Sequence, residues 1–177
     1  EAYIDIGKLI ELGADFDKCP DGSYHRTLEG GHGMNRIFHH ADTTGLEIET
    51  TLLRNVQQLD NVEILENAVM CNAKKTETGF SILVLTNDNE YNCRYAIFAT
   101  GGIGRVYEYT TNSAIATGDG ITIAHELGAE IKNLSYIQFH PTGFNNKHTR
   151  ETFLISESVR GEGAYLKNCN GERFMQN

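Results

Sequence analysis

The chain has few features that would suit a nucleic-acid or membrane partner. Its 177 residues carry 15 Lys and Arg against 24 Asp and Glu, which gives a formal net charge of -9. Nucleic-acid phosphates and anionic membrane surfaces both attract basic protein surface. No uninterrupted apolar run approaches the about 20 residues that span a bilayer. We therefore expect no nucleic-acid partner and no membrane partner.

Cysteine pairs and prolines are also scarce. The four cysteines (Cys19, Cys71, Cys93 and Cys169) are scattered and form no C-x-x-C pair. This pattern favours free thiols in a reducing, cytoplasmic setting over a zinc site or a disulfide framework. Only two prolines and 40% hydrophobic residues suit a globular protein. The length fits one domain, or one domain and part of another.

Histidines are concentrated between residues 24 and 40. This stretch holds four of the seven: His25, His32, His39 and His40. Imidazoles are common metal ligands, so zinc is the first alternative to weigh. However, no cysteine lies in the stretch, and its spacing matches neither a zinc finger nor an H-E-x-x-H motif. We therefore predict no metal site.

Hydrophobic periodicity predicts three helices. Apolar residues between Tyr3 and Leu12, followed by Gly13, predict an amphipathic helix with a glycine C-cap. Four leucines and a valine near helical spacing predict a second helix over residues 44–59. A third is expected to start at Gly118-Asp-Gly120 and to continue through residue 127. Its Asp119 could act simply as an N-terminal capping acid.

Short β-type runs lie between the second and third expected helices. The expected strands are residues 62–65, 68–74, 80–86, 91–94 and 95–99. Turns at residues 77–79 and 87–90 separate several of them, which predicts an antiparallel β-meander. Residues 80–85 are mostly apolar and are expected to be well buried. Near the carboxyl end we expect strand, turn and strand at residues 164–166, 168–171 and 173–174.

Residues 95–99 are expected to form a buried strand that ends in the glycine turn Thr100-Gly-Gly102. In doubly wound sheets, ligands bind at the carboxyl ends of such strands, where small residues allow close backbone approach. A glycine turn that only connects two elements is the alternative. The overall expectation is an α/β fold, part of a Rossmann-like domain with an antiparallel β-meander.

Side chains suited to acid–base chemistry are concentrated between Gln138 and Gly163. The stretch contains Gln138-Phe-His-Pro-Thr142, Phe153-Leu-Ile-Ser-Glu157 and Arg160-Gly-Glu-Gly163. Imidazole and hydroxyl groups bind carboxylate oxygens, and a Glu beside an Arg can relay a proton. Such groups suit a site that grips a small dicarboxylate and moves a proton beside it. Taken alone, His-Pro-Thr more often marks a turn with a surface histidine.

In their order along the chain, these segments resemble flavoproteins of the succinate dehydrogenase/fumarate reductase family. The resemblance covers essentially the whole chain. Within the family, Leu28-Glu-Gly-Gly-His32 is most similar to the L-aspartate oxidase branch. The other segments that carry the resemblance are Ala99-Thr-Gly-Gly102, Tyr109-Thr-Thr-Asn112, Gly118-Asp-Gly120, Gln138-Phe-His-Pro-Thr142, Glu157-Ser-Val-Arg-Gly-Glu-Gly163, Ala164-Tyr-Leu and Gly171-Glu-Arg-Phe-Met175.

The resemblance implies FAD as the cofactor and two domains. Residues 1–132 would be part of the FAD-binding domain, and residues 133–177 the start of a substrate-capping domain. The family's pyrophosphate loop and proton-exchanging arginine are not among these residues, so we expect an internal fragment that is itself inactive and binds FAD weakly. The implied flavin contacts are Ala68, Val69, Ala99, Thr100, Gly101, Gly102 and Asp119. For Ala68 and Val69, an ordinary buried strand is the alternative.

The resemblance also implies a site for a small dicarboxylate or amino acid, such as fumarate or L-aspartate. His140 and Thr142 would lie at this site, with His140 as a direct carboxylate ligand. Ser156 stands where the family commonly has threonine, and its hydroxyl could still bind carboxylate. Glu157 and Arg160 correspond to part of a proton route and are the expected catalytic residues. A structural ion pair, three residues apart on one helical turn, is the alternative.

Glu29 distinguishes between branches of the family. A carboxylate that faces the substrate Cα attracts an ammonium group and repels a plain dicarboxylate such as succinate. The resemblance to L-aspartate oxidases implies that Glu29 orients the amino acid. His32 is a further candidate for contact with substrate or flavin. An exposed loop glutamate is the alternative for Glu29.

The implied activity is the FAD-dependent oxidation of L-aspartate to iminoaspartate, the first step of quinolinate and NAD synthesis. Oxygen or fumarate would reoxidise the flavin, and quinolinate synthase is a further expected partner. One alternative is a soluble fumarate reductase or succinate dehydrogenase flavoprotein. Another is a folded binding module without activity.

Overall fold

The computed structural model describes residues 2–29, 31–86, 89–146, 148 and 152–175. The chain divides into two compact units, each described below by itself. The first unit consists of Glu1–Ile64 and Ile155–Asn177, and the second of Leu65–Leu154. The expected domain boundary at residue 133 stays a prediction. Gly30, together with Asn87 and Asp88 of the expected turn at residues 87–90, lies outside the described residues.

Two amphipathic helices are the longest helices of the described part of the first unit. Helix α1 (Ala2–Glu11) is followed by Gly13 at a φ of +96°, the left-handed conformation that suits a glycine C-cap. Helix α2 (Thr44–Val56) packs against α1. Both predicted helices are confirmed, although α2 ends at Val56 and not at residue 59.

A short antiparallel hairpin completes this part of the first unit. Strand β1 (Arg26–Thr27) pairs with strand β2 (Ile37–Phe38). The fully buried Phe16 ring packs edge-on against Phe38 at 5.7 Å between ring centroids. This aromatic contact joins the strand ends to the segment that follows α1, so the hairpin that presents residues 28–36 is anchored at its base.

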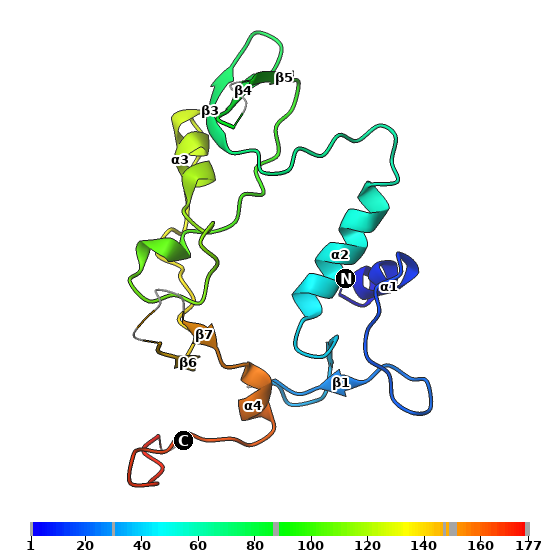
Figure 1. Cartoon of the computed structure of the whole chain (residues 1–177), viewed down its shortest axis with the longest axis vertical. Helices are drawn as coiled ribbons and strands as arrows, with labels where there is room; N and C mark the ends of the chain where they lie inside the picture. The colour runs from blue at the N-terminus through cyan, green and yellow to red at the C-terminus, as the bar shows by residue number, and fades with distance from the viewer. Residues whose placement is uncertain (1, 30, 87–88, 147, 149–151, 176–177) are drawn as a thin grey trace. The chain divides into compact units, whose positions relative to one another are not determined.

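The second unit is built around an antiparallel meander, as predicted. Strands β3 (Met70–Lys75), β4 (Phe80–Val84) and β5 (Asn89–Cys93) pair in the order β3-β4-β5. Helix α3 (Asp119–Glu126) packs against β3 (Figure 1). The expected third helix is thus confirmed.

Three short elements complete the described part of the second unit. They are the 3-10 helix η1 (Gly104–Val106) and the antiparallel pair β6 (Gly143–Phe144) and β7 (Phe153–Leu154). The mixed α/β character agrees with the expected fold class. Among the described strands every pairing is antiparallel, so the parallel sheet of a Rossmann-like domain is not formed by these residues.

Some of the expected strands are wrong. Residues 62–65 and 95–99 are irregular, and Tyr95 and Ile97 are 85% and 94% exposed where a buried strand was expected. A strand needs a neighbour to complete its hydrogen-bond ladder, and the described residues offer none to these segments. Strand β3 also begins at Met70 and not at residue 68.

Burial in the β4 region and the carboxyl-terminal turn both differ in part from expectation. Only Ser81 and Val84 of the stretch 80–85 are buried, and Leu83 and Leu85 are 38% and 61% exposed. The turn at residues 168–171 is present, and Gly171 has a φ of +81°. The strands expected on either side of it are reduced to a single bridge between Lys167 and Arg173.

Candidate functional site

A one-turn helix brings together the predicted proton-relay pair. In α4 (Glu157–Gly161), Nη2 of Arg160 donates a hydrogen bond to Oε1 of Glu157 at 2.7 Å. The Ser156 hydroxyl accepts from the Ser158 N–H at 3.3 Å and so caps the helix. Both side chains of the pair are 32% exposed, so water can reach them. The expected pairing is present, and its catalytic role stays a prediction.

Segment Leu28–Glu29 lies directly against the end of α4. A Cβ atom on Gly161 would overlap the Leu28 carbonyl oxygen and would lie 2.9 Å from the Leu28 carbonyl carbon and 3.3 Å from Glu29 Cα. The glycine therefore allows two backbone segments, far apart in the sequence, to touch. This contact places the loop that carries Glu29 beside the helix that carries Glu157 and Arg160.

Two buried nitrogen atoms in these segments have no partner among the described residues. They are Nδ1 of His32 and Nε of Arg160. His32 is held in place by its backbone, whose N–H donates to the Glu29 carbonyl at 3.0 Å. Buried polar atoms normally find a hydrogen-bond partner, so these two nitrogens stand out among the polar atoms of the first unit.

The other histidines of the expected cluster support the hairpin. Nδ1 of His25 lies 2.7 Å from Nε2 of His39, and Nδ1 of His39 lies 3.1 Å from Oδ2 of Asp17. The chain Asp17–His39–His25 fixes the base of the β1–β2 hairpin, from which residues 28–36 extend. Among the described residues, no group of His, Cys, Asp and Glu could hold a metal ion. All four cysteines are free.

In the second unit, His140 is oriented by the backbone of its own motif. Its Nδ1 lies 2.8 Å from the Thr142 carbonyl oxygen and 3.3 Å from the Thr142 backbone nitrogen. Thr142 itself is only 6% exposed. The backbone of Thr142 therefore supports the His140 imidazole from within the same motif.

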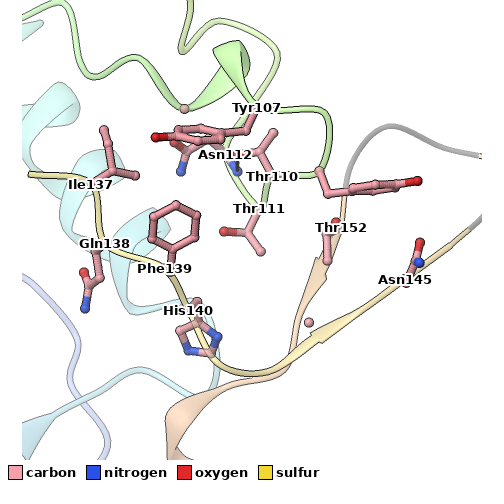
Figure 2. Close-up of a pocket in the computed structure, with 13 residues that line it drawn as sticks. Tyr107, Thr110, Thr111, Asn112, Ile137, Gln138, Phe139, His140, Asn145 and Thr152 are labelled. Carbon is pink, nitrogen blue, oxygen red and sulfur yellow. Dashed lines mark hydrogen bonds between the residues drawn. The ribbon is translucent and has the colours of Figure 1, made fainter. Parts of the chain in front are cut away.

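His140 lies at the edge of a cavity of about 320 Å³. Figure 2 shows the Phe139 ring between His140 and the turn that carries Tyr107 and Asn112. The Tyr107 and Phe139 rings meet edge-on at 5.5 Å. Among the residues that the structure describes, the lining is rich in hydroxyl and amide groups and contains no carboxylate, lysine or arginine. Such a surface binds oxygen atoms of a ligand by hydrogen bonds.

The sequence reasoning gave no role to the residues that form the far wall of this cavity. Asn112 fills the space where a Cβ atom of Gly104 would lie, and the Thr152 N–H donates to the Thr110 carbonyl at 2.9 Å. The sequence did contain a signal for this wall: Tyr109-Thr-Thr-Asn112 places three hydroxyl groups and an amide close to a glycine turn.

Three of the predicted flavin contacts line a second cavity, of about 360 Å³. Ala99, Thr100 and Gly101 form one wall, and Gly120 and Ile121 of α3 form part of the other. A Cβ atom on Gly120 would overlap the Thr100 side chain, so this glycine allows the wall and the helix to approach closely. Gly101 has a φ of +76° and open space beside it.

The remaining predicted flavin contacts lie outside this lining. Asp119 is the first residue of α3, and its carboxylate accepts a hydrogen bond from the Thr117 hydroxyl. Gly102 has open space beside it. Val69 is 56% exposed, and its N–H lies 3.3 Å from the Thr86 hydroxyl. With its neighbour Ala68, it precedes β3 in an irregular segment and not in the strand that was the alternative.

The predicted substrate residues therefore fall into two groups. Those of the first unit are Glu29, His32, Ser156, Glu157 and Arg160, and those of the second unit are His140 and Thr142. Each unit assembles its own group: a loop seated on a short helix in one, and an oriented imidazole beside a polar cavity in the other.

Comparisons with known proteins identify the family of the chain. A family described as an FAD binding domain matches residues 2–177. The chain is 46% identical to an L-aspartate oxidase of Clostridium perfringens over 179 residues, which are 99% of this chain and 40% of that protein. It is 40% identical to an L-aspartate oxidase of Clostridium acetobutylicum, with 99% and 41% of the two chains covered. The chain thus spans about 40% of the length of these curated relatives.

The fold also resembles a solved structure. A quinol fumarate reductase of E. coli, solved as a variant of its FrdA chain, superposes with a TM-score of 0.85 at 28% sequence identity. The match covers 96% of this chain and 29% of that chain. No helix in the described ranges is both long and apolar enough to cross a membrane.

Proposed function

Because the chain belongs to the FAD binding domain family, we propose that the whole protein that carries it oxidises L-aspartate to iminoaspartate. FAD, which the sequence predicted, is the cofactor in the family's description. The identities of 46% and 40% to two L-aspartate oxidases support the substrate assignment. The observation that carries the proposal is the Glu29 loop seated on the helix that holds Glu157 and Arg160.

The residues present fit the flavin. The open space beside Gly101, in a wall of small residues, leaves backbone groups accessible to a planar ring or a ribose. We propose that Ala99, Thr100, Gly101 and Gly102 contact the cofactor. Asp119, together with backbone groups of Ala68 and Val69, would add further contacts. When bound, FAD supplies the acceptor for the hydride that leaves the substrate Cα.

The protein's own groups bind and orient the amino acid. The Glu29 carboxylate attracts the substrate ammonium, and His32 lies in the same loop. His140, whose Nδ1 lies 2.8 Å from the Thr142 carbonyl oxygen, would bind a substrate carboxylate. The Ser156 hydroxyl, at the start of α4, is a further carboxylate ligand. Holding the ammonium at Glu29 and a carboxylate at Ser156, two residues of the first unit, fixes the direction of the Cα–H bond.

The Glu157–Arg160 pair moves the proton. Oxidation to the imine removes a hydride from Cα and a proton from the ammonium nitrogen. We propose that Glu157 accepts this proton, and that Arg160 keeps the carboxylate oriented through the 2.7 Å hydrogen bond. Because both side chains are one-third exposed, the proton can pass on to water.

Reduction of fumarate is the second candidate function. The similarity to quinol fumarate reductase, at a TM-score of 0.85, favours it. Fumarate has two carboxylates and no ammonium, so a carboxylate at Glu29 would repel it where it attracts L-aspartate.

Further parts of the proposal concern the protein's setting and organisation. The product would pass to quinolinate synthase, and the protein would work in the cytoplasm, where its four free thiols stay reduced. Residues 1–132 would belong to the FAD-binding domain and residues 133–177 to the capping domain.

The test is to mix the whole FAD-loaded protein anaerobically with L-aspartate and, separately, with succinate. The absorbance of the flavin is followed in both. Bleaching by L-aspartate alone is expected. The Glu29→Gln variant should lose about 30-fold or more in kcat/KM for L-aspartate, because it loses a charge pair with the ammonium. The matched control is Glu63→Gln, which changes an exposed glutamate elsewhere in the first unit. Bleaching by succinate alone would refute the proposal.

A further inference from the structure

We propose that Gly161 is a positioning residue for amino-acid specificity. It holds the backbone of Leu28–Glu29 against α4 and thereby sets where the Glu29 carboxylate lies relative to the Glu157–Arg160 pair. The inference deepens the proposed function, because it rests on the role of Glu29 in binding the substrate ammonium.

The contact is made by backbone on both sides. A Cβ atom on Gly161 would overlap the Leu28 carbonyl oxygen and would lie 2.9 Å from its carbon atom. Because no rotation of a side chain can relieve an overlap with backbone atoms, one of the two segments would have to move. At position 161, therefore, only glycine is compatible with the observed position of Leu28 and Glu29.

The conformation of Gly161 gives no other reason for a glycine. Its φ lies outside the left-handed region, unlike that of Gly163 at +94°. Inside a helix, alanine is a better residue than glycine. The close approach of the Leu28 backbone is thus the reason that position 161 requires a glycine.

Both segments are held firmly from their other sides. The hairpin base is fixed by the pairing of β1 with β2 and by the chain Asp17–His39–His25. The Glu162 N–H donates to the Ser158 carbonyl at 2.8 Å and closes the end of α4. Because the hairpin base and α4 are both anchored, a Cβ atom on Gly161 would displace the short stretch Leu28–Glu29 that lies against it.

Displacement of Glu29 affects one substrate more than another. Misplacing a binding group by about 1 Å can cost about 100-fold in rate. L-Aspartate needs Glu29 for its ammonium, whereas fumarate has no ammonium and needs only the carboxylate ligands and the proton relay. The Gly161→Ala variant should therefore lose about 100-fold in kcat/KM for L-aspartate and about 3-fold or less for fumarate reduction.

The experiment compares Gly161→Ala with Gly45→Ala in the whole FAD-loaded protein. Gly45 is also a helical glycine of the first unit, but a Cβ atom there meets nothing within 4 Å. Its substitution should leave both activities unchanged. An equal loss with both substrates in Gly161→Ala, or no loss at all, would overturn the inference.

A double-variant cycle tests whether Gly161 acts through Glu29. If it does, adding Gly161→Ala to Glu29→Gln should cost little beyond Glu29→Gln alone, because interacting sites are not additive. Full additivity would contradict the inference.

Hydrogen exchange separates this inference from the proposed function. The amides of Leu28, Glu29 and residues 31–33 should exchange about 10-fold faster in Gly161→Ala than in the wild type, because Leu28 and Glu29 lose their packing against α4. This readout does not depend on the substrate. Unchanged exchange would refute the role of Gly161 even if L-aspartate is oxidised. Failure of L-aspartate to bleach the wild-type flavin would refute the proposed function, and with it the specificity role.

Discussion

Arg160 and Glu157 share a hydrogen bond of 2.7 Å within a single helical turn, and each side chain is one-third exposed. A surface ion pair of this kind contributes little to stability, on the order of 0.5 kcal/mol. Its geometry therefore matters more for orienting the Glu157 carboxylate than for holding α4 together. The first prediction separates these two roles.

We expect Glu157→Gln to lower kcat by about 100-fold or more, because a glutamine cannot accept the substrate proton. KM should change little, since the carboxylate ligands stay in place. Steady-state kinetics with L-aspartate measure both values. The control is Glu162→Gln, an exposed glutamate in the turn after α4. Equal kinetic losses in the two variants, or a loss confined to thermal stability, would reduce the pair to a structural one.

A second prediction concerns the oriented imidazole. His140→Gln should raise KM about 10-fold or more for L-aspartate and for fumarate alike, because both lose a charge-assisted hydrogen bond to a carboxylate. His148→Gln, which changes an exposed histidine of the second unit, should leave both values unchanged. A KM increase for only one of the two substrates would contradict the assignment of His140 to a carboxylate that they share.

The pH dependence of stability should report on the contact between α2 and the end of α1. The Asp15 N–H, which donates to Oε1 of Glu47 at 2.8 Å, lowers the pKa of Glu47, and the Thr51 hydroxyl lowers it further. A carboxyl group whose pKa is depressed by folding stabilises the folded state above its unfolded pKa. That stability is lost as the pH falls through the folded pKa.

Glu47→Gln should therefore be less stable than the wild type at neutral pH. The difference should shrink as the pH falls below the ordinary glutamate value of 4.5. Thermal unfolding of the two proteins over this pH range measures the change. The exposed Glu66→Gln serves as the control. A stability difference that stays constant at all pH values would show that the Glu47 carboxylate is not linked to folding.

Local signals in the sequence were sufficient to predict the helices α1, α2 and α3. The apolar spacing and the glycine stop of α1 lie within one segment, and the same holds for the start of α3 at Gly118. Residues 95–99 have the composition of a strand, yet they remain irregular. Strand formation depends on a partner elsewhere in the chain, which a short window of sequence does not contain.

The candidate site shows the same division between local and distant contacts. The Glu157–Arg160 pair follows from a spacing of three residues on a helical turn, so the sequence predicted it. The contact between Gly161 and Leu28 joins distant segments through backbone atoms alone, and no pattern in either segment indicates it. The support of His140 by the Thr142 carbonyl is local, but it depends on the turn conformation and not on the residue types.

The last prediction concerns the wall of the proposed flavin cavity. Gly120→Ala places a methyl group where the Thr100 side chain lies, so α3 and the 99–101 wall must move apart. Because the proposed cofactor contacts lie on this wall, the Kd for FAD should rise about 10-fold or more, a loss of about 1.4 kcal/mol, and the purified variant should retain less bound FAD than the wild type. The absorbance of bound flavin per protein measures this. Gly7→Ala, at a helical position of α1 with open space around it, should keep its full complement. Full FAD content in Gly120→Ala, in a protein that still folds by circular dichroism, would remove residues 99–101 from the cofactor site.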